Sequence, residues 1–225
     1  MAHKFLDLVG TPAVLRAQEH YYGRARPVPP AAGDDPLGPR EAEFIAARDS
    51  FYMATVSASG WPYLQHRGGP PGFLRVLGPT RLAFADYEGN HQMVSTGNLA
   101  GDERVALFLM DYPNQRRLKV LGHAHALDAR TTPELVAQVA DAALDARVER
   151  VFVIDVVAFD WNCPQHITQR FSAAEVAAAV EPLRREIASL RARLDVDALT
   201  DHDADLLQKG LRADVALSEF DPAER

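Results

Sequence analysis

The feature that most constrains the fold is a succession of short β-type segments between residues 51 and 159. Segments rich in β-branched, aromatic and other apolar residues cover 51–57, 61–66, 73–77, 82–85, 105–110, 117–127 and 149–159. Turn sequences such as Ala58-Ser59-Gly60 and Gly78-Pro79 separate neighbouring segments, as in β-hairpins. Strands and helices do not alternate regularly, which disfavours a parallel sheet. The pattern predicts a mainly β (α+β) fold, a closed or nearly closed antiparallel barrel of six to seven strands with peripheral helices.

Helical patterns flank this region and give the expected organisation. Helices are predicted at about 12–22, 39–48, 91–96 and 132–144, the first opening at Thr11-Pro12 with a capping residue before proline. We expect three parts: an N-terminal helix and Pro-rich arm (1–43), the barrel (44–171), and a C-terminal helical extension with an acidic tail (172–225).

The C-terminal extension carries a heptad pattern. Apolar residues spaced 4-3-4-3-4 form its seam: Val176, Val180, Leu183, Ile187, Leu190 and Leu194. Pro182 interrupts the pattern and is expected to kink the helix or begin a new one. Such a seam packs either on the chain's own barrel or on a second subunit, and the sequence leaves both open.

Composition excludes several classes of protein. A net charge of −7 and a pI near 5.6 argue against sequence-independent binding of nucleic acid. The single cysteine, Cys163, rules out an internal disulfide framework and a Cys-rich zinc site. The N-terminus lacks the apolar core of a signal peptide, and no apolar run is long enough to span a membrane. We therefore expect a soluble cytoplasmic protein without nucleic-acid or membrane partners.

The loop that follows the second predicted strand is the strongest candidate for a ligand site. Gln65, His66 and Arg67 precede the run Gly68-Gly69-Pro70-Pro71-Gly72. The glycines allow close approach of a ligand, and the prolines make the loop rigid. A rigid loop beside an arginine suits a phosphate-bearing ligand. The alternative is a tight hairpin with an exposed arginine that has no function.

A second candidate follows the strand that ends near Asp86. Asn90 is placed to cap a short helix, whose first N–H groups would favour a phosphate. His91 and Gln92 would direct further donors to the same place.

Other segments offer weaker candidates. Arg116 and Arg117 begin a predicted strand. They either bind a ligand or are solubilising charges on a solvent-exposed edge of the sheet. The segment from Trp161 to Arg170 suits a ligand-facing wall, with an indole for stacking and a guanidinium for charge. Cys163 with His166 would alternatively suggest a thiolate nucleophile, but no activating third group is evident.

The spacing of His123 and His125 is that of metal ligands, but the sequence offers no third ligand, so no metal site is predicted. No nucleophile triad, Walker loop or Gly-x-Gly-x-x-Gly motif is found in the sequence.

Taken in this order, the segments from about Phe44 to Arg170 resemble the pyridoxamine 5′-phosphate oxidase-like family of split-barrel flavoproteins. Within it, Trp161–Arg170 looks like a signature of a branch described as predicted flavin-nucleotide-binding proteins. The resemblance implies a split antiparallel β-barrel, FMN as cofactor, and a homodimer with two sites at the subunit interface.

The resemblance also implies roles for individual residues. Phosphate contacts are expected from Arg67, His91 and Gln92. Gln65, His66, Asp86 and Asn90 would lie near the ring or the ribityl chain. Arg116 or Arg117, together with Trp161 and Arg170, would close the site from the partner subunit.

The chain departs from the oxidase proper at positions that matter for the FMN phosphate and for the substrate. His91-Gln92 replaces an Arg-Lys pair, Pro164-Gln165-His166 replaces an Arg-x-His substrate motif, and the Gly/Pro loop replaces a lysine after Arg67. We therefore expect an FMN-dependent oxidoreductase that passes hydride between FMN and an unidentified small molecule or electron donor, without vitamin B6 oxidase activity. No catalytic residue is assigned.

There are two alternatives: a non-enzymatic flavin sensor or carrier, and a haem-binding split barrel. The sequence also does not decide whether the cofactor is FMN or a deazaflavin.

Overall fold

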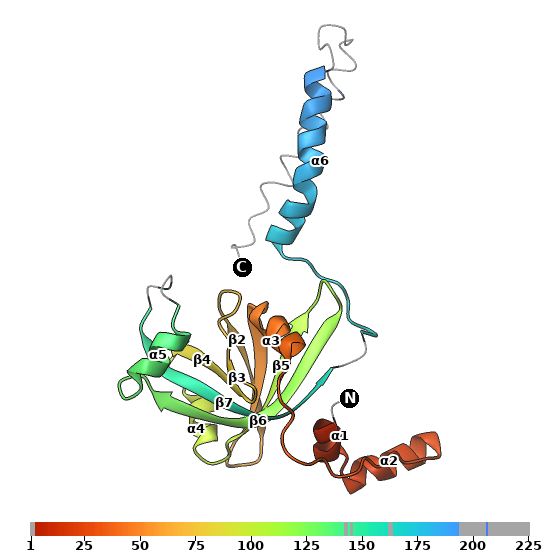
Figure 1. Cartoon of the computed structure of the whole chain (residues 1–225), viewed down its shortest axis with the longest axis vertical. Coiled ribbons are helices and arrows are strands. Elements are labelled where there is room, and N and C mark those ends of the chain that lie inside the picture. The colour runs from red at the N-terminus through yellow and green to blue at the C-terminus, as the bar shows by residue number, and fades with distance from the viewer. Residues whose placement is uncertain (1–2, 142–143, 145, 162–163, 194–205, 207–225) are drawn as a thin grey trace. The chain divides into compact units, whose positions relative to one another are not determined.

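The computed structural model describes residues 3–141, 144, 146–161, 164–193 and 206 (Figure 1). The chain divides into two compact units, residues 1–170 and 171–225, and each is described by itself. Within the described part of the chain, no helix combines the length and the apolarity needed to cross a membrane.

Seven strands form one sheet in the first unit. They are β1 (Ser50–Val56), β2 (Pro62–Gly68), β3 (Arg75–Gly78), β4 (Arg81–Tyr87), β5 (Arg104–Asp111), β6 (Arg116–Asp128) and β7 (Val148–Trp161). Their order in the sheet is β2-β1-β5-β6-β7-β4-β3, and every neighbouring pair is antiparallel. Each β-type segment identified in the sequence is therefore a strand.

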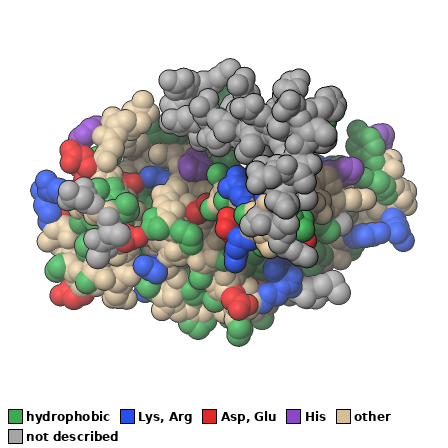
Figure 2. Space-filling view, turned by 90° about the horizontal axis from the view of Figure 1, so that it is seen from above, with side chains coloured by type: hydrophobic (Ala, Val, Ile, Leu, Met, Phe, Trp, Pro, Cys, Tyr) green, Lys and Arg blue, Asp and Glu red, His purple; other side chains and the backbone are tan. Residues whose placement is uncertain are grey.

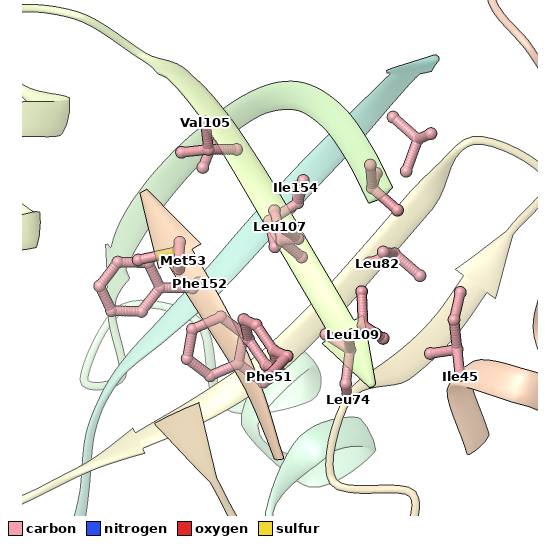
Figure 3. Close-up of a cluster of buried hydrophobic side chains, with 14 of the residues drawn as sticks. Ile45, Phe51, Met53, Leu74, Leu82, Val105, Leu107, Leu109, Phe152 and Ile154 are labelled. Atoms are coloured by element: carbon pink, nitrogen blue, oxygen red, sulfur yellow. The ribbon is translucent and has the colours of Figure 1, made fainter. Parts of the chain in front are cut away.

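The sheet curls strongly, which brings its two ends together around one core. Three strands separate β1 from β4 in the sheet order, yet the rings of Phe51 and Phe84 lie 5.3 Å apart. In a flat sheet, four strand spacings would separate them by about 19 Å. Phe84 also stacks on Phe152 of β7 at 5.0 Å, and Figure 3 shows Phe51 and Phe152 among the aliphatic side chains of the same interior. The expected split antiparallel barrel is confirmed.

The path of β6 beside β7 depends on Gly122. The register of the two strands shifts between Leu121 and Gly122, which marks a β-bulge. A β-carbon built on Gly122 would lie 2.5 Å from the carbonyl oxygen of Asp155. Glycine is needed here because the two backbones approach too closely for any side chain.

Replacing Gly122 by alanine is expected to lower the free energy of unfolding by about 1–3 kcal/mol, because the two backbones must move apart. Chemical denaturation followed by circular dichroism measures this change. Gly78→Ala is the matched control, since nothing lies within 4 Å of its β-carbon position. Equal losses in the two variants would contradict the close-approach argument.

Five helices accompany the sheet in the first unit: α1 (His3–Val9), α2 (Pro12–Tyr22), α3 (Pro39–Ala46), α4 (Val94–Leu99) and α5 (Pro133–Val139). The predicted start of α2 is confirmed, with the Thr11 hydroxyl accepting a hydrogen bond from the Val14 N–H at 3.4 Å.

Two predicted helices need correction. The helix expected at 91–96 begins only at Val94, because His91 and Met93 adopt left-handed φ angles of 59° and 55°. The helix expected at 132–144 ends at Val139. After it the chain is extended, and the N–H of Asp141 donates to the Tyr87 hydroxyl at 2.9 Å.

The second unit contains α6 (Ala173–Arg193). A capping box begins it: the Ser172 hydroxyl accepts from the Glu175 N–H at 3.2 Å, and the Glu175 carboxylate accepts from the Ser172 N–H at 2.7 Å. The helix runs through Pro182, so no new helix begins there. Leu194 of the predicted seam and, apart from Leu206, the acidic tail lie outside the described residues.

Candidate functional site

A cavity of about 290 Å³ lies among β2, the end of β4, β7, and the loop that leads into α4. We call it the barrel-end cavity. Its lining includes six of the residues that the sequence predicted for the ligand: Gln65, Arg67, Asp86, Asn90, His91 and Gln92. The structure therefore brings the two strongest candidate segments of the sequence together at one place.

The alternation of side chains along β2 decides which of its residues reach the barrel-end cavity. Tyr63, Gln65 and Arg67 line it, as expected for every second residue of a strand. His66 lies on the opposite face, where its ring is 5.6 Å from that of Tyr52. Within one chain, His66 is therefore not brought to the cavity.

Asp86 lies between two arginines in the wall of the barrel-end cavity. Its Oδ1 accepts a hydrogen bond from Arg67 Nη1 at 2.6 Å, and its Oδ2 accepts from Arg150 Nε at 2.9 Å. These side chains, the Asp86 cluster, are only 13–16% exposed. Glu149 accepts a further hydrogen bond from Arg150 at 2.9 Å, so two carboxylates balance two guanidinium groups. The short charge-assisted bonds hold Arg67 in one orientation.

Arg67 also lies against the aromatic core. Its guanidinium carbon is 4.9 Å from the ring centroid of Phe152 and 5.6 Å from that of Phe84. Its Nε is buried and has no hydrogen-bond partner within the described residues. Because an unpaired buried donor is costly, an acceptor group of a ligand would relieve a penalty at this point.

Two hydrogen bonds position α4 beside the barrel-end cavity. The Ser95 hydroxyl donates to Gln65 Oε1 at 2.8 Å, and Asn98 Nδ2 donates to Thr55 Oγ1 at 2.9 Å. Both hydroxyl-bearing residues, Ser95 and Thr55, are buried. These bonds connect the short helix to β2 and β1, which fixes the cavity wall that α4 supplies.

The loop before α4 forms the exposed rim of the barrel-end cavity. Asn90 does not cap the helix, as the sequence suggested; its Oδ1 accepts from the N–H of Gln92 at 3.2 Å, and Met93 takes the cap position. The left-handed residues His91 and Met93 delay the helix, which explains the correction. His91 lies 3.9 Å from a Glu88 carboxylate oxygen and its side chain is 64% exposed.

The sequence did not predict several of the residues that line this cavity, among them Tyr63, Ser95 and Arg150. Tyr63 was available from the alternation with Gln65 and Arg67. Arg150 pairs directly with Asp86 in the register of β4 and β7, a relation between distant segments that no local motif reveals.

Four other predicted residues lie outside the barrel-end cavity of their own chain. Arg116 lies over the rings of Trp161 and Phe44, at 5.0 and 5.3 Å from their centroids. Trp161 also donates from Nε1 to Glu41 Oε1 at 2.7 Å.

Arg117 lies 5.9 Å from the ring centroid of Phe108, and Arg170 lies 5.0 Å from that of Tyr112. For all four, the role expected from the resemblance, closing the site of a partner subunit, stays a prediction.

The remaining histidine and cysteine candidates lie apart from this cavity. His123 and His125 both face Glu103, with nitrogen–oxygen distances of 3.2 and 3.6 Å. Among the described residues, no group of three or more His, Cys, Asp or Glu side chains is arranged to hold a metal ion. Cys163 lies outside the described residues, so the thiolate hypothesis with His166 is not tested.

Charged side chains of both signs are interspersed on the face of the molecule that Figure 2 displays.

Comparison with known proteins identifies a family for most of the barrel. The family model described as pyridoxamine 5′-phosphate oxidase matches residues 37–160, more than half of the chain. No curated protein matches the chain.

Several solved structures are similar at low sequence identity. HupZ from Group A Streptococcus is 12% identical with a TM-score of 0.44, covering 60% of this chain and 100% of that chain. A protein related to general stress protein 26 from Clostridium acetobutylicum is 14% identical with a TM-score of 0.43, covering 61% and 94%. An FMN-binding protein from Syntrophomonas wolfei is 12% identical with a TM-score of 0.42, covering 53% and 81%. At these values we transfer no ligand or activity from them.

Proposed function

Because the chain belongs to the pyridoxamine 5′-phosphate oxidase family, we propose that it is an FMN-binding oxidoreductase that passes hydride between FMN and a small molecule. One observation carries the proposal. The barrel-end cavity combines the Asp86 cluster, in which one arginine donor lacks a partner, with amide and hydroxyl side chains from two other segments.

The chemistry of these side chains fits the groups of FMN. A phosphate needs cationic and neutral donors, which Arg67, His91 and Gln92 supply. Ribityl hydroxyls and the polar edge of the ring need both donors and acceptors, which Gln65 and Asn90 supply. The assignment therefore keeps the expected roles for these residues.

Arg67 enters this assignment as an oriented group rather than a free cation. Asp86 already accepts one of its N–H groups. Its remaining donors are available to a phosphate or to a carbonyl of the ring, with the guanidinium plane fixed by Asp86 and by Phe152.

FMN, when bound, supplies a carrier of hydride at its ring. The chain supplies binding and orientation. Asp86 positions Arg67, the Ser95–Gln65 hydrogen bond positions the amide of Gln65, and the aromatic core behind Arg67 excludes water from one side of the cavity.

We propose a substrate other than pyridoxamine phosphate. The family oxidase is expected to place an Arg-x-His motif on its substrate, whereas this chain has Pro164-Gln165-His166. At the rim, His91 replaces a cation and is widely exposed. The chain therefore lacks the arginine of the substrate motif and the rim cation that the oxidase is expected to carry.

We propose that a second copy of the chain completes the site. The barrel-end cavity, at about 290 Å³, is at the lower limit of about 300–1,000 Å³ that is usual for sites enclosing small ligands. Residues Arg116, Trp161 and Arg170, which lie outside the cavity of their own chain, are the expected contributors from the second copy.

The test is the absorption spectrum of freshly purified protein, followed by titration with FMN and with riboflavin. We expect flavin bands or saturable quenching of added FMN, and riboflavin binding about 10- to 100-fold weaker, because it lacks the phosphate and its charge-assisted hydrogen bonds. A Soret band would favour the haem-binding alternative. Protein that shows no flavin bands and does not quench added FMN would overturn the proposal.

A second measurement separates an enzyme from a flavin carrier. NADH or NADPH is added to the FMN-loaded protein under anaerobic conditions, and bleaching of the flavin band is recorded. Bleaching that exceeds the rate with free FMN supports an oxidoreductase. Loaded protein that no donor reduces faster than free FMN would support the carrier.

A further inference from the structure

Helix α6 has a long apolar face whose large side chains are about half exposed. Val176, Leu183, Ile187 and Leu190 are 48–57% exposed, and with Val180 they follow one side of a helix of 21 residues. Such a helix is about 31 Å long. Helices in water owe most of their stability to packing of an apolar face, so this face predicts a packing partner.

The choice of residues along this face indicates what the partner is. With heptad position a at Val180 and Ile187, position d falls on Leu183 and Leu190. In a coiled coil, β-branched residues at position a combined with leucine at position d favour a parallel pair of helices over trimers and tetramers. A second copy of the same helix is therefore the partner that fits.

The charges beside the seam favour a parallel orientation. Arg184 and Arg191 occupy position e, and Glu186 occupies position g. In a parallel pair, g of one helix meets e of the next heptad of the other, so Glu186 lies beside Arg191 of the second copy. An antiparallel pair would instead place arginines of the two copies against one another.

The opposite face of α6 has the features of a solvent-facing surface. Glu181 and Arg185, at positions b and f, form an ion pair at 3.4 Å. Pro182 falls at position c, on the outer side, and the helix continues through it. The proline is therefore compatible with packing along the seam.

We propose that α6 of two copies of this chain form a parallel, in-register, two-stranded coiled coil. This proposal rests on α6 alone and does not depend on FMN binding at the barrel-end cavity.

Cysteine cross-linking of the full chain tests the proposal. In a Cys163→Ser background, Leu190→Cys is expected to give a disulfide-linked dimer under mild oxidation, because identical d positions face each other at about the 4.4–6.8 Å between α-carbons that a disulfide needs. Ser189→Cys, at the outer position c, is the matched control and is expected to stay unlinked. The products are separated on a non-reducing denaturing gel.

Second substitutions test whether the seam itself causes the link. Adding Ile187→Glu to Leu190→Cys is expected to abolish the linked band, whereas adding Ala188→Glu, with the same charge at the outer position b, is expected to keep it. Circular dichroism shows that each variant is folded.

Folded Leu190→Cys that remains unlinked, or Ser189→Cys that links equally well, would overturn the proposal. An antiparallel pair would give the first of these results, since it places Leu190 opposite the other end of α6. FMN titration of the same variants reports separately on the cavity, so failure of the coiled coil and failure of the proposed function are distinguishable.

Discussion

Replacing Arg67 by alanine is expected to weaken FMN binding about 10- to 100-fold, which corresponds to about 1.5–3 kcal/mol for a hydrogen bond to a charged group. The reason is geometric as well as electrostatic. Asp86 and Phe152 fix the guanidinium of Arg67 in the wall of the barrel-end cavity, so its donors are already oriented for the ligand. Fluorescence titration with FMN measures the loss.

Arg81→Ala is the matched control for this prediction. Arg81 lies on β4 and, like Arg67, pairs with an aspartate, here Asp155 at 2.8 Å, but it is 57% exposed and does not line the cavity. We expect its FMN affinity to equal that of the unchanged chain. Arg67→Lys should give an intermediate affinity, because it keeps the charge and loses the planar fork. Unchanged affinity in Arg67→Ala would refute the assignment of Arg67 as an anchor.

Replacing Asp86 by asparagine is expected to lower the free energy of unfolding by about 3 kcal/mol, at the lower end of the range for breaking a buried ion pair. The substitution keeps the shape and removes the carboxylate that Arg67 and Arg150 share. Arg150 retains Glu149, whereas Arg67 loses the carboxylate that balances it. Thermal and chemical denaturation measure the change.

The corresponding control is Asp155→Asn, which breaks the exposed pair with Arg81. An exposed pair contributes about 0–1 kcal/mol, so the loss should be much smaller. Inorganic phosphate should also raise the melting temperature of Asp86→Asn more than that of the unchanged chain, because a small anion can take the place of the carboxylate between Arg67 and Arg150. Similar losses in the two variants would show that the Asp86 cluster is not an important ionic contact.

The barrel was predictable because its signals are local. Each strand has its own apolar pattern and its own turn, so the seven segments could be recognised one at a time. The errors in the predicted helix boundaries occurred where a contact with a distant residue determines the backbone conformation. The hydroxyl of Tyr87 binds the chain just after α5, and neither the pattern of residues 132–144 nor its helix propensity contains that information.

The site was predictable to the extent that it is built from contiguous segments. Arg67 and Gln65 followed from a single loop, and Asp86 from the strand that precedes the next loop. Arg150 did not, because it reaches the cavity only through the register of β4 with β7, two strands far apart in the sequence. Likewise, the unfavourable φ angles of His91 and Met93 arise from the tertiary structure, so the sequence placed the start of α4 too early.

The two edge strands of the sheet give the cavity a mechanical role. β2 and β3 stand at opposite ends of the strand order, so side chains rather than a backbone ladder hold the β2 end of the sheet beside β4. The barrel-end cavity spans this split, with Gln65 and Arg67 on one side and Asp86 and Arg150 on the other. A ligand bound there would contact both sides of the split and so hold the β2 end of the sheet beside β4. Amide hydrogens of β2 should therefore exchange faster than those of β6 and β7 in the ligand-free protein. Ligand binding in the barrel-end cavity should slow the exchange of the β2 amides.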